Sequence, residues 1–166
     1  MSIKLSILPH QTECLERAIQ VFDKVRLDKT NEIFANPLID INDVNLKRNI
    51  WEIQENFNEK KIPKEYRTYR ENNFGIDIRM ETGTGKTYCY TRLIYELNQK
   101  YGFHKFIILV PTTPIKEGTK SFITSDYANK HFSDLYPNKK LTLSILNAQK
   151  NKKGKRKIFP QAISDF

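Results

Sequence analysis

The sequence contains little of what defines several large classes of protein. Its 166 residues include only two cysteines, Cys14 and Cys89. Two are too few for the disulfide framework of a small secreted domain, so we expect buried thiols in a reducing compartment. No apolar run approaches the roughly 20 residues of a membrane span, and the apolar part of the N-terminus is too short for a signal peptide. The sequence therefore predicts a cytoplasmic protein without a membrane partner.

Histidines are few, and basic residues outnumber acidic ones. The three histidines, His10, His104 and His131, have no metal-ligand spacing. Lysine and arginine outnumber aspartate and glutamate by 28 to 19, giving a net charge of +9, but six of these positive charges lie in Lys150–Lys157, which leaves +3 for the rest. The excess is therefore one local tract. It either holds a nucleic-acid backbone or forms a solvated loop, and both interpretations remain open.

The most informative stretch is Met80–Thr87, which reads M-E-T-G-T-G-K-T. It matches the phosphate-loop pattern G-x-x-x-x-G-K-[ST] except that Met80 replaces the first glycine. Residues 75–80 alternate apolar and polar side chains as a half-buried strand does, and apolar residues recur at helical spacing up to Tyr101. Gly102 follows where a C-terminal helix cap is expected. Strand, glycine loop and helix form the arrangement that this motif requires.

Each residue of the loop has a chemical task. Gly83 and Gly85 permit positive φ, so that the backbone N–H groups around Thr84 converge on an anion. The helix that begins near Lys86 adds the positive end of its dipole. We expect Lys86 to reach the β- and γ-phosphates of ATP and the Thr87 hydroxyl to bind Mg²⁺. The alternative is a turn rich in glycine and threonine with a chance lysine.

Upstream, Leu8–Gln11 opens a helix whose apolar side continues to Val25. The amide of Gln11 carries donors and acceptors that match the edge of adenine. A glutamine in a first helical turn is more often only solvated. The presence of the phosphate loop downstream is what supports an adenine-binding role for Gln11.

The chain order predicts an α/β fold with a mainly parallel central sheet. Ile76–Met80, the helix 86–101 and Phe106–Val110 form a βαβ unit with a right-handed crossover. Leu141–Leu146 alternates and predicts a third strand. Residues 26–73 read as an insertion that contains a helix within 43–57 capped by Asn42 or Asp43. The insertion is either a polar cover on the sheet or a surface that contacts nucleic acid.

A second anion site is predicted where the Phe106–Val110 strand ends. Thr113 is placed as an N-cap with Pro114 at the first helical position. Backbone amides and threonine hydroxyls at Pro111, Thr112 and Thr113 suit a nucleic-acid phosphate. An ordinary strand-to-helix connection explains the same residues equally well.

A nucleotide motor also needs an apolar strand that ends in acidic residues, to hold Mg²⁺ and orient the attacking water. No such strand follows Leu146, and Asp165 has no apolar run before it. The sheet is therefore expected to be incomplete at its C-terminal end, and we expect no ATP hydrolysis by this chain alone.

Three motifs, Leu8–Gln11, Met80–Thr87 and Ile107–Gly118, resemble those of superfamily 2 helicases and translocases. The chain most resembles the restriction (Res) subunit of type III restriction–modification enzymes, densely over 76–122 and more thinly over 8–22. The resemblance implies that residues 1–166 are the N-terminal portion of a first RecA-like motor domain, with an insertion at about 26–73. It also implies adenine binding by Gln11, binding of ATP and Mg²⁺ by Gly83–Thr87, and DNA contact by Pro111–Thr113.

In that family the whole subunit uses ATP to translocate on double-stranded DNA and cleaves it with a separate nuclease domain, together with a methylating (Mod) subunit. These are the functions that the resemblance implies for the full-length protein. Two alternatives remain open. One is another superfamily 2 DNA or RNA helicase, and the other is a truncated, non-catalytic fragment that binds nucleotide or DNA.

Overall fold

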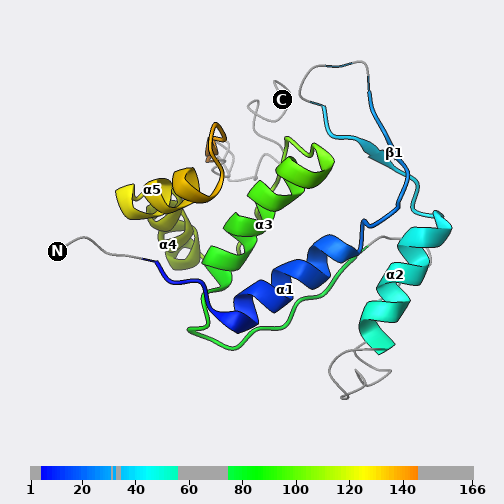
Figure 1. Ribbon diagram of the computed structural model, residues 1–166. Helices are drawn as coiled ribbons and strands as arrows, with labels where there is room; N and C mark the ends of the chain where they lie inside the picture. The colour runs from blue at the N-terminus through cyan, green and yellow to red at the C-terminus, as the bar shows by residue number, and fades with distance from the viewer. Residues whose placement is uncertain (1–4, 31, 33–34, 56–74, 146–166) are drawn as a thin grey trace, which may run out of the picture.

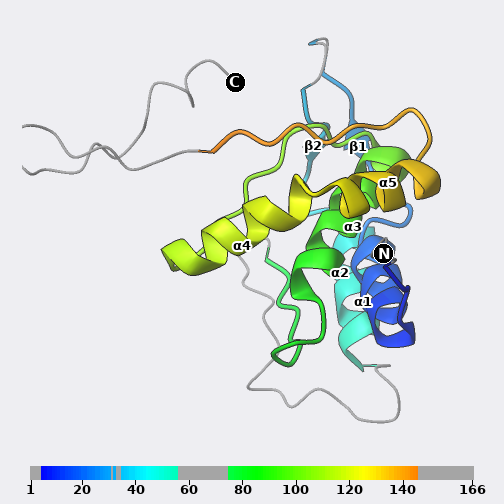
Figure 2. The same ribbon diagram turned by 90° about the vertical axis from the view of Figure 1, so that its left-hand side faces the viewer.

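The computed structural model describes residues 5–30, 32, 35–55 and 75–145. In this part of the chain the helix α3 lies in the middle, with α1 and α2 to one side of it and α4 and α5 to the other (Figures 1 and 2). The described helices are α1 (Pro9–Gln20), α2 (Val44–Glu55), α3 (Lys86–Tyr101), α4 (Thr113–Ile123) and α5 (Asp126–Leu135). The strands are β1 (Leu27–Asp28) and β2 (Leu38–Ile39).

Helix α3 begins and ends where the sequence predicts. Its N-cap, Gly85, is in the left-handed region with φ 86°. At the other end Gly102 has φ 77°, and its N–H donates to the carbonyl of Asn98. The Phe103 N–H donates back to Leu97 O, which completes the hydrogen-bonded C-cap. Glycine is required at both ends because side chains make left-handed backbone costly.

The other helices are set by their first turns. Pro9 occupies the first position of α1, where its missing N–H costs nothing. Asp43 caps α2 by accepting hydrogen bonds from the backbone N–H groups of Asn45 and Leu46, and the bond from Leu46 is the main cause of its lowered pKa. The predicted N-cap of α4 was wrong by one residue. Thr112 is the cap and Thr113 the first helical residue.

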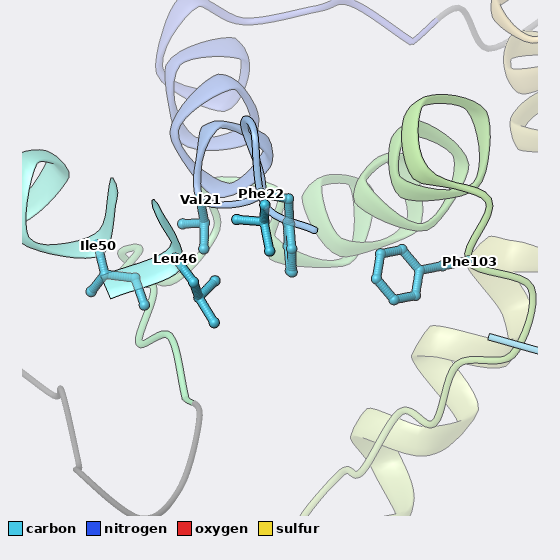
Figure 3. Close-up of a cluster of buried hydrophobic side chains, with 6 residues drawn as sticks. Val21, Phe22, Leu46, Ile50 and Phe103 are labelled. Carbon is cyan, nitrogen blue, oxygen red and sulfur yellow. The ribbon is translucent and has the colours of Figure 1, made fainter. Parts of the chain in front are cut away.

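The first hydrophobic core joins α1 to the segment that we predicted as an insertion (Figure 3). Leu46 and Ile50 of α2 pack against Val21 and Phe22 at the end of α1, and Phe103 closes the cluster from beyond α3. The Leu46 side chain is completely buried. The expectation of a polar cover is therefore wrong for this part of the insertion, because α2 contributes to the core itself.

The second core is aromatic and connects α3 to α5. Tyr95 of α3 stacks on Phe132 and Tyr136, with ring centroids 5.1 Å and 5.0 Å apart. Tyr88 stacks on Phe132 at 5.6 Å. Burial of such large rings stabilises the contact between α3 and the α5 region. Leu135, the last residue of α5, is partly exposed.

The structure does not confirm the predicted central parallel sheet. Residues 75–80, 106–110 and 141–145 have no regular secondary structure, and the sixth residue of the third predicted strand, Leu146, lies outside the described residues. The only sheet within the described part of the chain is the antiparallel pair β1–β2, with Leu27 opposite Ile39. A strand exists only where a neighbour accepts its hydrogen bonds, and these three segments do not pair with one another.

Candidate functional site

The phosphate loop has the backbone geometry that its glycines predict. Gly83 and Gly85 both adopt left-handed conformations, with φ 84° and 86°. The loop leads directly into α3, a helix of 16 residues, so the unpaired N–H groups of its first turn lie next to the loop. This arrangement combines an anion-binding backbone with the positive end of a helix dipole.

The Lys86 side chain reaches back from the start of α3 to the first residues of the loop. Its ammonium donates to the carbonyl oxygens of Met80 and Glu81, at 2.9 Å and 2.7 Å. The Thr84 hydroxyl also donates to Glu81 O, at 2.7 Å. The lysine is exposed, so its charge is held within the loop by two neutral acceptors and remains open to a stronger, anionic one.

Thr87 lies in the first turn of α3 and is half-buried. Its own carbonyl accepts a hydrogen bond from the Thr91 hydroxyl at 2.7 Å. The backbone at Thr87 is therefore fixed from one turn further along the helix. The predicted phosphate-binding and magnesium-binding residues, Lys86 and Thr87, are the first two residues of α3.

Gln11 is buried, with 4% of its surface exposed, so the expectation of a merely solvated glutamine is wrong. Its Oε1 accepts from the Leu8 N–H at 3.3 Å, which caps α1. Its Nε2 donates to Thr84 O in the phosphate loop at 3.1 Å. A Cβ built on Gly85 would lie 2.5 Å from this Nε2. The structure thus brings Gln11 into direct contact with the loop.

His10 also reaches the loop, although its sequence pattern predicted no role for it. Its Nε2 lies 3.2 Å from Thr84 O. The residue next to it, Gln11, bonds the same carbonyl oxygen. The one signal for His10 in the sequence was its position beside Gln11 in a short motif.

A cavity of about 560 Å³ adjoins the loop. Its walls come from α1, α2 and residues 76–81, and both His10 and Thr84 line it. The apolar part of the wall includes Val21, Ile50 and Ile53. A cavity with an apolar wall and a few polar groups is typical of small-molecule sites.

The predicted DNA-contacting residues lie on a different element. Pro111, Thr112 and Thr113 are exposed and form the turn into α4. Helix α4 is tied to α3 by a hydrogen bond of 2.7 Å between the hydroxyls of Tyr90 and Thr119. The turn is thus connected to the phosphate-loop helix, although no contact between Pro111–Thr113 and the loop itself is observed in the described residues.

A polar cluster that the sequence did not reveal connects α3 to α5. The Tyr136 hydroxyl donates to Glu96 Oε1 at 2.6 Å and accepts from Arg92 Nε at 3.2 Å. Burial, reinforced by the bond to Glu96, raises the Tyr136 pKa. One turn earlier in α3, the Tyr88 hydroxyl hydrogen-bonds His131 Nε2 at 3.0 Å. Burial lowers the pKa of this imidazole.

Both cysteines are free thiols, and Cys89 is buried in α3. Burial is the main cause that raises the Cys89 pKa to about 11. Among the described residues no group of three histidine, cysteine or acidic side chains is arranged to hold a metal ion. The basic tract Lys150–Lys157 and Asp165 lie outside these residues. No described helix is both long and apolar enough to span a bilayer.

A glycine-rich loop is followed by a lysine at the start of a long helix, and this lysine donates a hydrogen bond back to the loop. This is the arrangement of a phosphate-loop protein. Comparison with known families agrees: the family described as "Type III restriction enzyme, res subunit" matches residues 4–164. The chain therefore belongs to the family of type III restriction enzyme Res subunits, as the resemblance of its motifs predicted. Membership in this family implies a RecA-like phosphate-loop fold.

Individual relatives support the assignment. The chain is 42% identical to the Res subunit of the type III restriction–modification enzyme StyLTI of Salmonella typhimurium, over all of the chain and 14% of that protein. It is 38% identical to the EcoP15I Res subunit of Escherichia coli and 37% identical to the EcoPI Res subunit of Escherichia phage P1, each over 96% of the chain and 16% of the relative. The chain thus spans about one seventh of the length of these relatives.

Proposed function

We propose that this chain is the N-terminal portion of the first motor domain of a type III Res subunit and that it binds Mg-ATP. The observation that carries the proposal is the loop Gly83–Thr87. It combines two left-handed glycines, a lysine directed into the loop and the N-terminus of a long helix. In this proposal residues 26–73 remain an insertion within the motor domain, and its helix α2 belongs to the core.

The residues present fit a bound nucleotide triphosphate. Lys86 now donates to two neutral carbonyls, and phosphate oxygens are stronger acceptors for an ammonium group. The exposed lysine is free to move from these carbonyls to the β- and γ-phosphates. Thr87 follows it in the first turn, where its hydroxyl would hold Mg²⁺. Mg-ATP would be the substrate of phosphoryl transfer in the full-length protein, where Lys86 would stabilise the charge that develops on the phosphates.

Gln11 is proposed as the adenine-binding residue. An amide side chain has two N–H donors and two acceptor lone pairs. The bonds to Leu8 and Thr84 use one of each. The remaining N–H and lone pair match the bidentate pattern of adenine. The cavity of about 560 Å³ beside the loop is lined by His10, the neighbour of Gln11, and by Thr84, whose carbonyl accepts from the Gln11 amide.

Pro111, Thr112 and Thr113 are proposed to contact the DNA backbone. All three are exposed, and Thr112 and Thr113 lie where the N-terminus of α4 presents unpaired N–H groups. The Tyr90–Thr119 bond offers a physical link between this turn and the nucleotide-binding helix. In the full-length protein we propose ATP-driven translocation on double-stranded DNA and DNA cleavage in the cytoplasm, together with a Mod subunit, whereas this chain alone does not turn ATP over.

The variant Lys86→Ala tests the phosphate loop. It removes the ammonium group that donates to the carbonyls of Met80 and Glu81, so we expect titration with Mg-ATP to show no binding. Lys120→Ala, which removes another exposed lysine on α4, is the matched control and should bind like the unmodified chain. Equal ATP affinity in the two variants would contradict the assignment.

A further inference from the structure

His10 lies beside the phosphate loop without belonging to it. Its Nε2 is 3.2 Å from Thr84 O, and Gln11 Nε2 is 3.1 Å from the same oxygen. A carbonyl oxygen only accepts hydrogen bonds, so this contact requires a proton on His10 Nε2. Two consecutive side chains from the first turn of α1 therefore donate to one carbonyl of the loop, filling both of its lone pairs.

The bonded carbonyl lies between the two left-handed glycines. The peptide unit that joins Thr84 to Gly85 is planar and trans. In a trans unit the N–H points opposite to the C=O, so the Gly85 N–H is directed away from α1. Glycine backbone is otherwise free to rotate. Holding the Thr84 carbonyl thus also fixes the direction in which the Gly85 N–H can donate.

We propose that His10 is a positioning residue for the phosphate loop: it holds the Thr84 carbonyl toward α1 and thereby aims the Gly85 N–H at the bound phosphate. The inference rests on the proposed nucleotide site and adds to it a residue whose role does not depend on the base. Gln11 is buried and caps α1, so its loss would also disturb the helix. His10 is exposed, and its replacement leaves the core intact.

A set of three variants isolates the Nε2 donor. The amide nitrogen of glutamine reaches the place of a histidine Nε2, whereas the shorter asparagine reaches only the place of Nδ1. His10→Gln should therefore behave like the unmodified chain, and His10→Asn should behave like His10→Ala. This pairing separates the hydrogen bond from the polarity of the side chain.

The first measurement is affinity for Mg-ATP and for inorganic tripolyphosphate, which has no base. His10→Ala should weaken both by the same factor, about fivefold, which corresponds to ~1 kcal/mol. Because His10 also lines the adjoining cavity, a contact with the base is the rival explanation. A loss for ATP with no loss for tripolyphosphate would overturn the positioning role.

The second measurement needs no nucleotide. Backbone ¹⁵N relaxation of residues 82–86 should give lower order parameters in His10→Ala and His10→Asn, and His10→Gln should restore the values of the unmodified chain. Unchanged order parameters in all three variants would overturn the inference. If the unmodified chain bound neither ATP nor tripolyphosphate, the proposed function would fail, while the order parameters would still decide whether His10 holds the loop.

Discussion

Single residues at the phosphate loop show what local sequence predicts and what it omits. The left-handed backbone at Gly83 and Gly85 follows from the motif, because the chain turns sharply there. The contact between Gln11 and Thr84 joins residues 73 positions apart. Only the tertiary fold brings them together, so the motif predicted that Gln11 matters but not what it touches. The same reason explains why His10 was missed.

The two loop glycines should differ in their response to alanine. At Gly83 the added Cβ meets open space, whereas at Gly85 it would lie 2.5 Å from Gln11 Nε2. Both substitutions cost about 1–2 kcal/mol for left-handed backbone, but only Gly85→Ala also displaces a buried side chain. Thermal unfolding should therefore show a lower Tm for Gly85→Ala than for Gly83→Ala. Equal Tm values would contradict the close packing of Gln11 on Gly85.

At the scale of elements, apolar periodicity and capping residues predicted the helices well. The bounds of α3 and the caps Asp43 and Gly102 follow from local chemistry. Contacts between elements did not follow from the sequence. The bond from Tyr90 to Thr119 and the cluster around Tyr136 join side chains 29 and 40 or more residues apart. Such pairs leave no periodic signal in one sequence.

A double-mutant cycle can test the hydrogen bond between Tyr90 of α3 and Thr119 of α4. Tyr90→Phe and Thr119→Val each remove one hydroxyl of a partly buried bond of 2.7 Å. Each should lower the free energy of unfolding by ~1 kcal/mol. The double variant should lower the free energy of unfolding by clearly less than the sum of the two single losses, because both changes remove the same interaction. Urea denaturation measures the three values, and additive losses would show that the hydroxyls do not interact in solution.

The contact between α1 and α3 should depend on pH. Asp23, just beyond α1, accepts from Lys100 at 2.7 Å and from Tyr101 at 2.8 Å, and the bond to Lys100 is the main cause that lowers its pKa. A carboxylate whose pKa is lowered in the folded state stabilises the fold at pH values above its unfolded pKa of about 3.9. This stabilisation is lost as the pH falls through the folded pKa.

Asp23→Asn should therefore be less stable than the unmodified chain near neutral pH. The loss should stay below ~1 kcal/mol because the pair is about half exposed. Denaturation at several pH values should show the difference shrinking below about pH 4. A difference that stayed constant into acid would mean that the carboxylate charge contributes nothing to this contact.

At the scale of the whole molecule, the sequence predicted more sheet than the described residues contain. Ile107 and Leu109 have 79% and 89% of their surface exposed, although their apolar run is typical of a buried parallel strand. A helix carries its hydrogen bonds within one segment, so it forms where its own residues favour it. A sheet requires partner strands, and no local pattern predicts whether they are present.

The exposure of this run leads to a test of the fold. Ile107→Lys with Leu109→Lys should change the free energy of unfolding by no more than ~0.5 kcal/mol, as for other surface changes. Phe103→Ala, in the first core, is the control and should cost about 3–5 kcal/mol. Urea denaturation compares the two. A loss in the double variant as large as in the control would mean that residues 106–110 are buried, as the sequence predicted.

Nucleotide binding by the phosphate loop is tested by calorimetric titration of the 166-residue chain with Mg-ATP, with an ATPase assay on the same sample. We expect saturable binding of one nucleotide without turnover, because the loop Gly83–Thr87 is formed and no acidic strand follows Leu146 in the sequence. Absence of binding would contradict the assignment of the loop. Turnover would contradict the expectation that the chain lacks a residue essential for hydrolysis.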